Sequence, residues 1–132
     1  MKKKNGLTGK TDQDFSKALW ELENLMDGCS VKFILLGDIA KRLKDGLKLD
    51  GLTKIEVGVP KLQLSKYAVS SLRTLKGENW QHLEFNGIPI EIKIVQRKYK
   101  FFKFPDKAVH WGGWFNIPNP MDTYWKSRFL VR

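Results

Sequence analysis

The sequence predicts an α/β (α+β) domain in which helices pack against a small mixed sheet. Apolar residues recur at helical spacing in three stretches, and they alternate or run continuously in four short stretches. The two kinds of stretch follow one another along the chain, an order that places helices against the face of a sheet. A chain of 132 residues, of which 42% are hydrophobic, is long enough to bury one core of this kind.

Three helices are expected. The first begins after Thr11, whose hydroxyl can cap a helix N-terminus, and it ends at Gly28. The second covers residues 38–47 and the third covers residues 62–75, each with apolar residues on one face.

Four strands are expected, at residues 31–36, 54–59, 82–85 and 88–95. The last two are joined by Asn86-Gly87, which favours a two-residue hairpin because both turn residues must adopt positive φ.

The pattern weakens after residue 95. Residues 96–104 are basic and aromatic, residues 110–120 read as a loop rich in Trp, Gly and Pro, and residues 122–130 could form a final short helix. The expected organisation is therefore a flexible basic tail over residues 1–10 and a single domain over residues 11–132, which includes the basic aromatic C-terminal segment 96–132.

The net charge of +10 is concentrated in the terminal segments. Residues 1–10 contain four lysines and no acid, and residues 93–132 contain nine Lys or Arg against two Asp, whereas the part between them is nearly neutral. Such a distribution favours a polyanionic partner, namely nucleic acid, a nucleotide or an acidic surface. A basic composition that serves only solubility is the alternative.

Cysteine usage and hydropathy bear on the compartment. Cys29 is the only cysteine, so no intrachain disulfide can form, as is typical of a reducing compartment. No apolar run reaches membrane-spanning length, and no apolar stretch follows the basic start as in a signal peptide. We expect a cytoplasmic protein with no membrane partner.

The expected strands carry one candidate site. Lys54 and Glu56 are two residues apart on one strand and therefore share a face, and Glu91 could meet them from a neighbouring strand. Three carboxylates in this arrangement would hold a divalent metal for nucleotidyl or phosphoryl transfer. Lys54 stands at one of these three positions, which indicates an altered or inactive site. The alternative is that these charged residues occupy the solvent side of strands whose Ile and Val residues face the core.

This order of elements resembles the nucleotidyltransferase superfamily, whose palm is related to that of DNA polymerase β. Leu36-Gly37-Asp38 falls at that family's glycine motif, Lys54-Ile55-Glu56 at its acid pair, and Glu91 at its third acid. The resemblance covers roughly residues 12–95 as a pattern of elements. It implies a palm-like fold and, if the site is active, nucleotidyl or phosphoryl transfer with Mg²⁺ or Mn²⁺.

The resemblance also implies roles for single residues. Glu56 and Glu91 would be catalytic and would hold the metal. Gly37 would approach the phosphates, with Asp38 beside it, and Lys54 or Lys66 would neutralise charge. In a non-catalytic relative, Lys54 would instead pair with Glu56 or Glu91 and replace the metal by an ion pair.

Residues 97–104 suggest a second function. Cations and aromatic rings alternate there, and the candidate nucleic-acid ligands are Arg97, Lys98, Tyr99, Lys100, Phe101 and Lys103. Aromatic rings stack on unpaired bases while cations hold phosphates, so single-stranded nucleic acid is a plausible ligand. An edge strand with a buried aromatic face is the alternative.

Trp111 and Trp114 suggest a third function. They stand beside two glycines and could form an exposed loop that docks a partner protein, as in an inhibitor or antitoxin-like factor. Large aromatic residues in such loops also close the end of a small core, which is the alternative.

Overall fold

The computed structural model describes residues 9–95, 105–121 and 123–125. Most of the expected basic tail, the expected nucleic-acid ligands between residues 97 and 103, and most of the expected final helix lie outside these residues.

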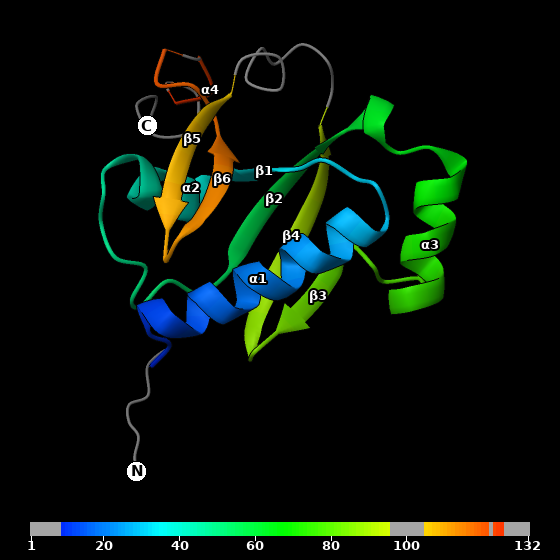
Figure 1. The fold of residues 1–132 in the computed structure, drawn as a ribbon, viewed down its shortest axis with the longest axis horizontal. Coiled ribbons are helices and arrows are strands. Elements are labelled where there is room, and N and C mark those ends of the chain that lie inside the picture. Colours follow the sequence, from blue (N-terminus) through cyan, green and yellow to red (C-terminus); the bar gives the residue numbers. More distant parts are fainter. Residues whose placement is uncertain (1–8, 96–104, 122, 126–132) are drawn as a thin grey trace.

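The described part of the chain is a mixed α+β fold, as the sequence predicts (Figure 1). Its elements in chain order are α1 (Asp12–Gly28), β1 (Ile34–Leu36), α2 (Gly37–Lys44), β2 (Ile55–Pro60), the 3-10 turn η1 (Lys61–Gln63), α3 (Lys66–Lys76), β3 (His82–Phe85), β4 (Ile88–Val95), β5 (Asp106–His110), β6 (Gly113–Ile117) and α4 (Thr123–Trp125). Strands β1, β2, β4 and β3 form a four-stranded sheet in that order, and β5 and β6 form a separate hairpin. Strands β2 and β4 are parallel, whereas β1 and β3 are antiparallel to their neighbours.

The start of α1 is set by a capping box. The hydroxyl of Thr11 accepts the backbone N–H of Asp14, and the carboxylate of Asp14 accepts the backbone N–H of Thr11 at 2.9 Å. These two bonds satisfy N–H groups that have no partner within the helix, which explains why the sequence located this boundary correctly.

Other boundaries differ from the expected ones. The N–H of Val31 bonds to the carbonyl of Met26, so this residue closes α1 and β1 begins only at Ile34. The helix expected to reach residue 47 ends at Lys44, because Gly46 adopts φ +70° and the N–H of Leu47 bonds back to Arg42.

The third helix begins four residues later than expected. The hydroxyl of Ser65 accepts the N–H of Ala68 and caps α3, whereas the preceding residues form the 3-10 turn η1. The capping serine therefore marks the boundary, and Leu62, expected at the helix start, is 71% exposed.

The expected hairpin at Asn86-Gly87 is present, with φ of 53° and 77°. The expectation of a loop over residues 110–120 is wrong, because β5 and β6 pair there through a second two-residue turn. In that turn Trp111 has φ 51° and Gly112 has φ 83°. A bulky residue rarely adopts positive φ, so the turn carries little local signal at its first position.

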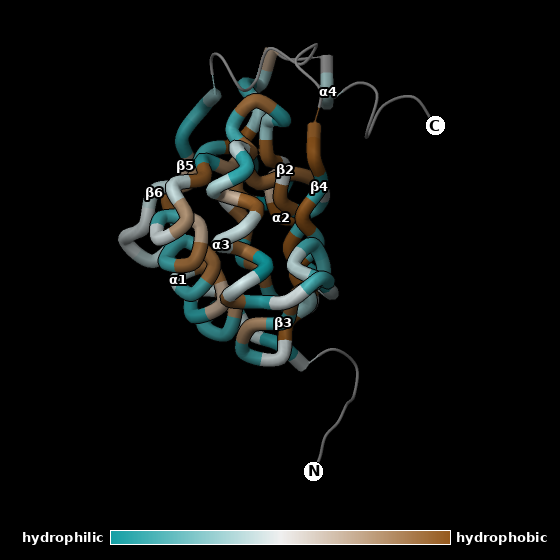
Figure 2. Tube along the Cα trace, turned by 90° about the vertical axis from the view of Figure 1, so that its right-hand side faces the viewer, coloured by the Kyte–Doolittle hydropathy of each residue, from teal (hydrophilic) through white to brown (hydrophobic). Residues whose placement is uncertain are grey.

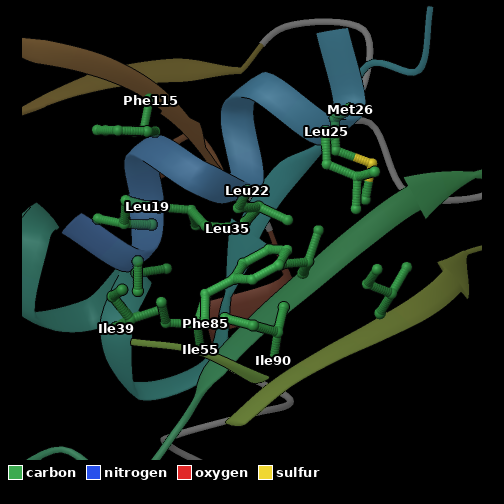
Figure 3. Close-up of a cluster of buried hydrophobic side chains, with 14 of the residues drawn as sticks. Leu19, Leu22, Leu25, Met26, Leu35, Ile39, Ile55, Phe85, Ile90 and Phe115 are labelled. Carbon is green, nitrogen blue, oxygen red and sulfur yellow. The ribbon is translucent and has the colours of Figure 1, made fainter. Parts of the chain in front are cut away.

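The core lies between α1 and one face of the four-stranded sheet. Figure 3 shows Leu19 and Leu22 of α1 directed toward Leu35 of β1, and Met26 belongs to the same buried cluster. In Figure 2 the chain is coloured mostly hydrophobic along β2 and β4, the two central strands of the sheet. The expected alternation of buried residues along β4 holds at Ile88, Ile90 and Ile92, but Ile94 is 41% exposed.

The opposite face of the sheet has its own small apolar cluster, built from Ile34 and Leu36 with Val95 and Tyr124 packed against them. The charged residues of the candidate site occupy the rest of this face. No helix in the described ranges is long and apolar enough to cross a membrane.

Candidate functional site

Glu56 and Glu91 lie directly opposite each other on neighbouring parallel strands. Glu56 of β2 is the register partner of Glu91 of β4, and on its other side it pairs with Leu36 of β1. Side chains at the same register of adjacent strands point to the same face. The structure thus brings together the two acids that the resemblance singled out.

Each acid is bound by a lysine. The Nζ atom of Lys54 lies 3.2 Å from Oε1 of Glu91, and the Nζ atom of Lys93 lies 3.0 Å from Oε1 of Glu56. We call these four residues the ion-pair quartet. Lys93 was missed by sequence reasoning, although its place two residues after Glu91 puts it on the same face.

The two ion pairs differ in burial. The side chain of Glu56 is only 4% exposed, whereas those of Glu91 and Lys54 are 35% and 39% exposed. The alternative that Glu56 faces solvent is therefore wrong. A buried carboxylate requires compensating charge or hydrogen bonds, and the Lys93 ammonium supplies part of this compensation.

Gly37 stands against the buried carboxylate. A Cβ atom added at Gly37 would lie 1.8 Å from Oε2 of Glu56, and its φ of +66° also disfavours a side chain. The backbone N–H of Gly37 donates to the phenolic oxygen of Tyr124 at 2.6 Å. Groups of the chain itself therefore surround the glycine turn at the start of α2, where the helix dipole favours negative charge.

The remaining expected ligands lie further out. Asp38 is exposed in the first turn of α2. Lys66 begins α3, beyond the opposite end of β2, and lines a surface groove with Ser70 and Arg73. Within the described ranges Lys66 forms no ion pair with Glu56, so the structure does not unite it with the quartet.

The quartet is a poor match for a divalent cation. Two carboxylates and two ammonium groups carry no net charge, and sites for Mg²⁺ or Mn²⁺ depend on anionic oxygen ligands. Among the residues that the structure describes, no three His, Cys, Asp or Glu side chains are grouped to hold a metal.

A second polar cluster, unforeseen from the sequence, joins the start of α1 to the tip of the β5–β6 hairpin (Figure 1). The carboxylate of Asp12 accepts the indole N–H of Trp111 at 2.6 Å and the backbone N–H of Leu49 at 2.8 Å, and it lies 2.9 Å from Nε2 of His110. Burial alone would raise the pKa of Asp12, but the hydrogen bonds from Trp111, Leu49 and His110 lower it to about 2.

No protein-family model, curated protein or solved structure matches this chain. What the fold and the site define is an α+β domain with a charged site on the sheet face opposite its main core.

Proposed function

We propose that this protein is a nucleotidyltransferase-type domain that binds a nucleotide, or a similar phosphorylated molecule, without metal-dependent transfer. The observation that carries the proposal is the ion-pair quartet, in which Lys54 and Lys93 neutralise the carboxylates of Glu91 and Glu56. A cytoplasmic location belongs to the same proposal, and it is supported by the buried, free thiol of Cys29.

The arrangement on the sheet supports this class of protein. The glycine turn follows β1 directly, and Glu56 lies beside it on β2, with Glu91 across from it on β4. A glycine turn and acidic residues on one face of a small sheet are the features by which the sequence resembles the nucleotidyltransferase superfamily.

The lysines account for the loss of catalysis in this proposal. A metal ion acts as a Lewis acid that stabilises charge on the attacking and leaving oxygens. An ammonium group supplies positive charge and hydrogen bonds but cannot coordinate those oxygens in the same way. In this proposal the lysine N–H donors can bind phosphate although the four charges cancel, and the two paired carboxylates are not available to hold a metal for transfer.

The same lysines provide the means to bind phosphate. An ammonium group has three N–H donors, and the ion pair of each lysine with its glutamate engages one carboxylate oxygen. The side chains of Lys54 and Lys93 are 39% and 53% exposed, so their other donors can reach a ligand from solvent. Glu56, beneath them, is shielded from a bound anion by Lys93.

Calorimetric titration with each nucleoside triphosphate, in EDTA and in Mn²⁺, tests the proposal. We expect one triphosphate to bind in EDTA, with similar affinity when Mn²⁺ is present. Lys54→Ala and Lys93→Ala should weaken this binding, whereas Lys61→Ala, an exposed lysine on η1, should leave it unchanged.

Two outcomes would contradict the proposal. Binding that requires Mn²⁺ and disappears in Glu91→Ala would establish a metal-dependent site instead. Absence of binding under both conditions would reject a nucleotide site altogether. The expected nucleic-acid function depends on residues 97–103, outside the described ranges, and it stays a prediction.

A further inference from the structure

Four large apolar side chains are exposed together around the β5–β6 hairpin. They are Leu47, Val109, Trp111 and Trp114, between 51% and 62% exposed, and we call them the aromatic patch. Val109 and Trp114 are register partners on one face of the hairpin. Leu47, Val109 and Trp111 line the same groove, which has a volume of about 220 Å³. The patch is therefore contiguous and partly concave.

Trp111 is held outward at a conformational cost. Its φ of 51° is unfavourable for a bulky side chain, and its ring is 59% exposed. The hydrogen bond from its indole N–H to Asp12, at 2.6 Å, fixes the ring in this position. Backbone strain of this kind is concentrated at functional sites, and a fixed ring loses little entropy when a partner binds.

Two lysines border the groove. Lys48 lines the groove, and Lys107 is exposed two residues before Val109 on the same face of β5. Three carboxylates lie nearby, and each accepts hydrogen bonds within the protein. Asp12 lines the groove with its side chain 18% exposed and bound by the three groups described above, Asp50 accepts the backbone N–H of Asp12, and Asp106 accepts the backbone N–H of Lys107. An approaching segment thus meets apolar walls bordered by ammonium groups.

We infer that the aromatic patch is a docking surface for an acidic protein segment that inserts an apolar side chain into the groove between Leu47 and Trp111. Charge complementarity favours this occupant, because exposed Lys48 and Lys107 border the groove and the whole chain carries a net charge of +10. The same net charge opposes a second copy of this chain as the partner. The aliphatic walls of Leu43, Leu47 and Val109 suit an apolar side chain better than a stacked base.

Selection from a library of random short peptides tests this inference on the intact protein. Peptides that bind the wild-type protein are kept, and those that also bind the Trp114→Ser/Val109→Glu variant are removed. Both substitutions in this variant affect exposed side chains only. The enriched peptides should be acidic with one conserved apolar residue. Their affinity, measured by fluorescence anisotropy, should fall about tenfold or more in the double variant. Trp20→Ser, an equally exposed tryptophan on α1, should have no effect.

Chemical shifts of the tryptophan indole N–H groups in the wild-type protein provide a readout that needs no variant. Peptide titration should move the Trp111 and Trp114 signals and leave that of Trp20 in place.

Failure to enrich acidic peptides, or equal binding to the double variant, would overturn the inference. If oligo(dT) binds more tightly than the peptide and moves the same Trp111 and Trp114 signals, the patch is a nucleic-acid site and the inference is overturned. Self-association that is lost in the double variant would assign it to a second copy. None of these results depends on nucleotide binding by the quartet.

Discussion

The phenolic oxygen of Tyr124 accepts the backbone N–H of Gly37 at 2.6 Å, joining residues 87 positions apart in the chain. The next residue, Trp125, stacks edge-on against Tyr124, with ring centroids 5.3 Å apart. The ammonium of Lys44 lies 5.4 Å from the centroid of the Trp125 ring. Two consecutive aromatic residues therefore contact the first and last residues of α2, so the C-terminal part of the chain helps to position the glycine turn.

Tyr124→Phe should destabilise the protein by removing the acceptor of the Gly37 N–H. The expected loss is about 1 kcal/mol of unfolding free energy, measured by urea denaturation. Hydrogen exchange of the Gly37 amide should become faster in the same variant. Tyr67→Phe, at a tyrosine that is 70% exposed on α3, is the matched control and should change neither quantity. Unchanged exchange at Gly37 would contradict this assignment of the hydrogen bond.

The two ion pairs of the quartet should contribute unequally to stability. Lys93→Ala removes the ammonium beside the buried Glu56, and we expect a cost of about 1–3 kcal/mol. Lys54→Ala breaks a pair in which both side chains are more than a third exposed, and we expect a cost below about 1 kcal/mol. Urea denaturation of both variants gives the comparison.

A double variant separates charge from packing in this comparison. Adding Glu56→Gln to Lys93→Ala removes the buried charge and should restore part of the lost stability. Equal losses in the two single variants, or no recovery in the double variant, would show that burial of Glu56 does not determine the effect.

Gly37→Ala should be more destabilising than Gly46→Ala. Both glycines have positive φ, of +66° and +70°, so both substitutions strain the backbone by about 1 kcal/mol or more. Only at Gly37 would the added Cβ also collide with the carboxylate of Glu56, because no atom lies within 4 Å of the corresponding position at Gly46. Thermal denaturation measures the difference, and Glu56→Asp should relieve part of the Gly37→Ala defect by shortening the side chain.

Lys54→Asp should create a metal site. The substitution places a third carboxylate beside Glu56 and Glu91, and it removes the ammonium that now occupies Glu91. Mn²⁺ binding, followed by electron paramagnetic resonance, should be measurable in this variant and much weaker in Lys54→Asn. If Mn²⁺ fails to bind Lys54→Asp, the assignment of these three positions to a former metal site is wrong.

The Asp12 cluster should make stability depend on acid pH. The pKa of Asp12 is lowered from 3.8 to about 2 in the folded protein, so folding favours the ionised carboxylate. Its contribution is fully present above pH 3.8 and is lost as the pH falls toward 2. Asp12→Asn should lower stability at pH 7 and reduce the further fall between pH 4 and pH 2, as measured by urea denaturation at each pH.

Asp27→Asn, at an exposed aspartate near the other end of α1, is the control for this experiment. It should leave the pH profile of stability as it is in the wild type. An Asp12→Asn profile parallel to that of the wild type would show that the hydrogen bonds of Asp12 do not favour its ionised form.

Local chemistry made much of the fold predictable. The capping box at Thr11 and the Asn86-Gly87 turn involve residues within a few positions of each other, so their signals can be read from short stretches of sequence. The β5–β6 hairpin could not be predicted in this way. Its turn begins with Trp111, a bulky residue with positive φ, and the indole of this residue bonds to the carboxylate of Asp12, 99 positions away in the chain.

By itself, the sequence determined the types of the helices and strands up to residue 95, most of the inward faces of β2 and β4, and the candidates Glu56 and Glu91. Only the tertiary structure decided that Lys93 pairs with Glu56 and that Lys54 pairs with Glu91. The physical reason is that strand neighbours are chosen by burial of the apolar face against α1. Once β2 and β4 lie side by side for that reason, their register determines which charged side chains meet on the opposite face.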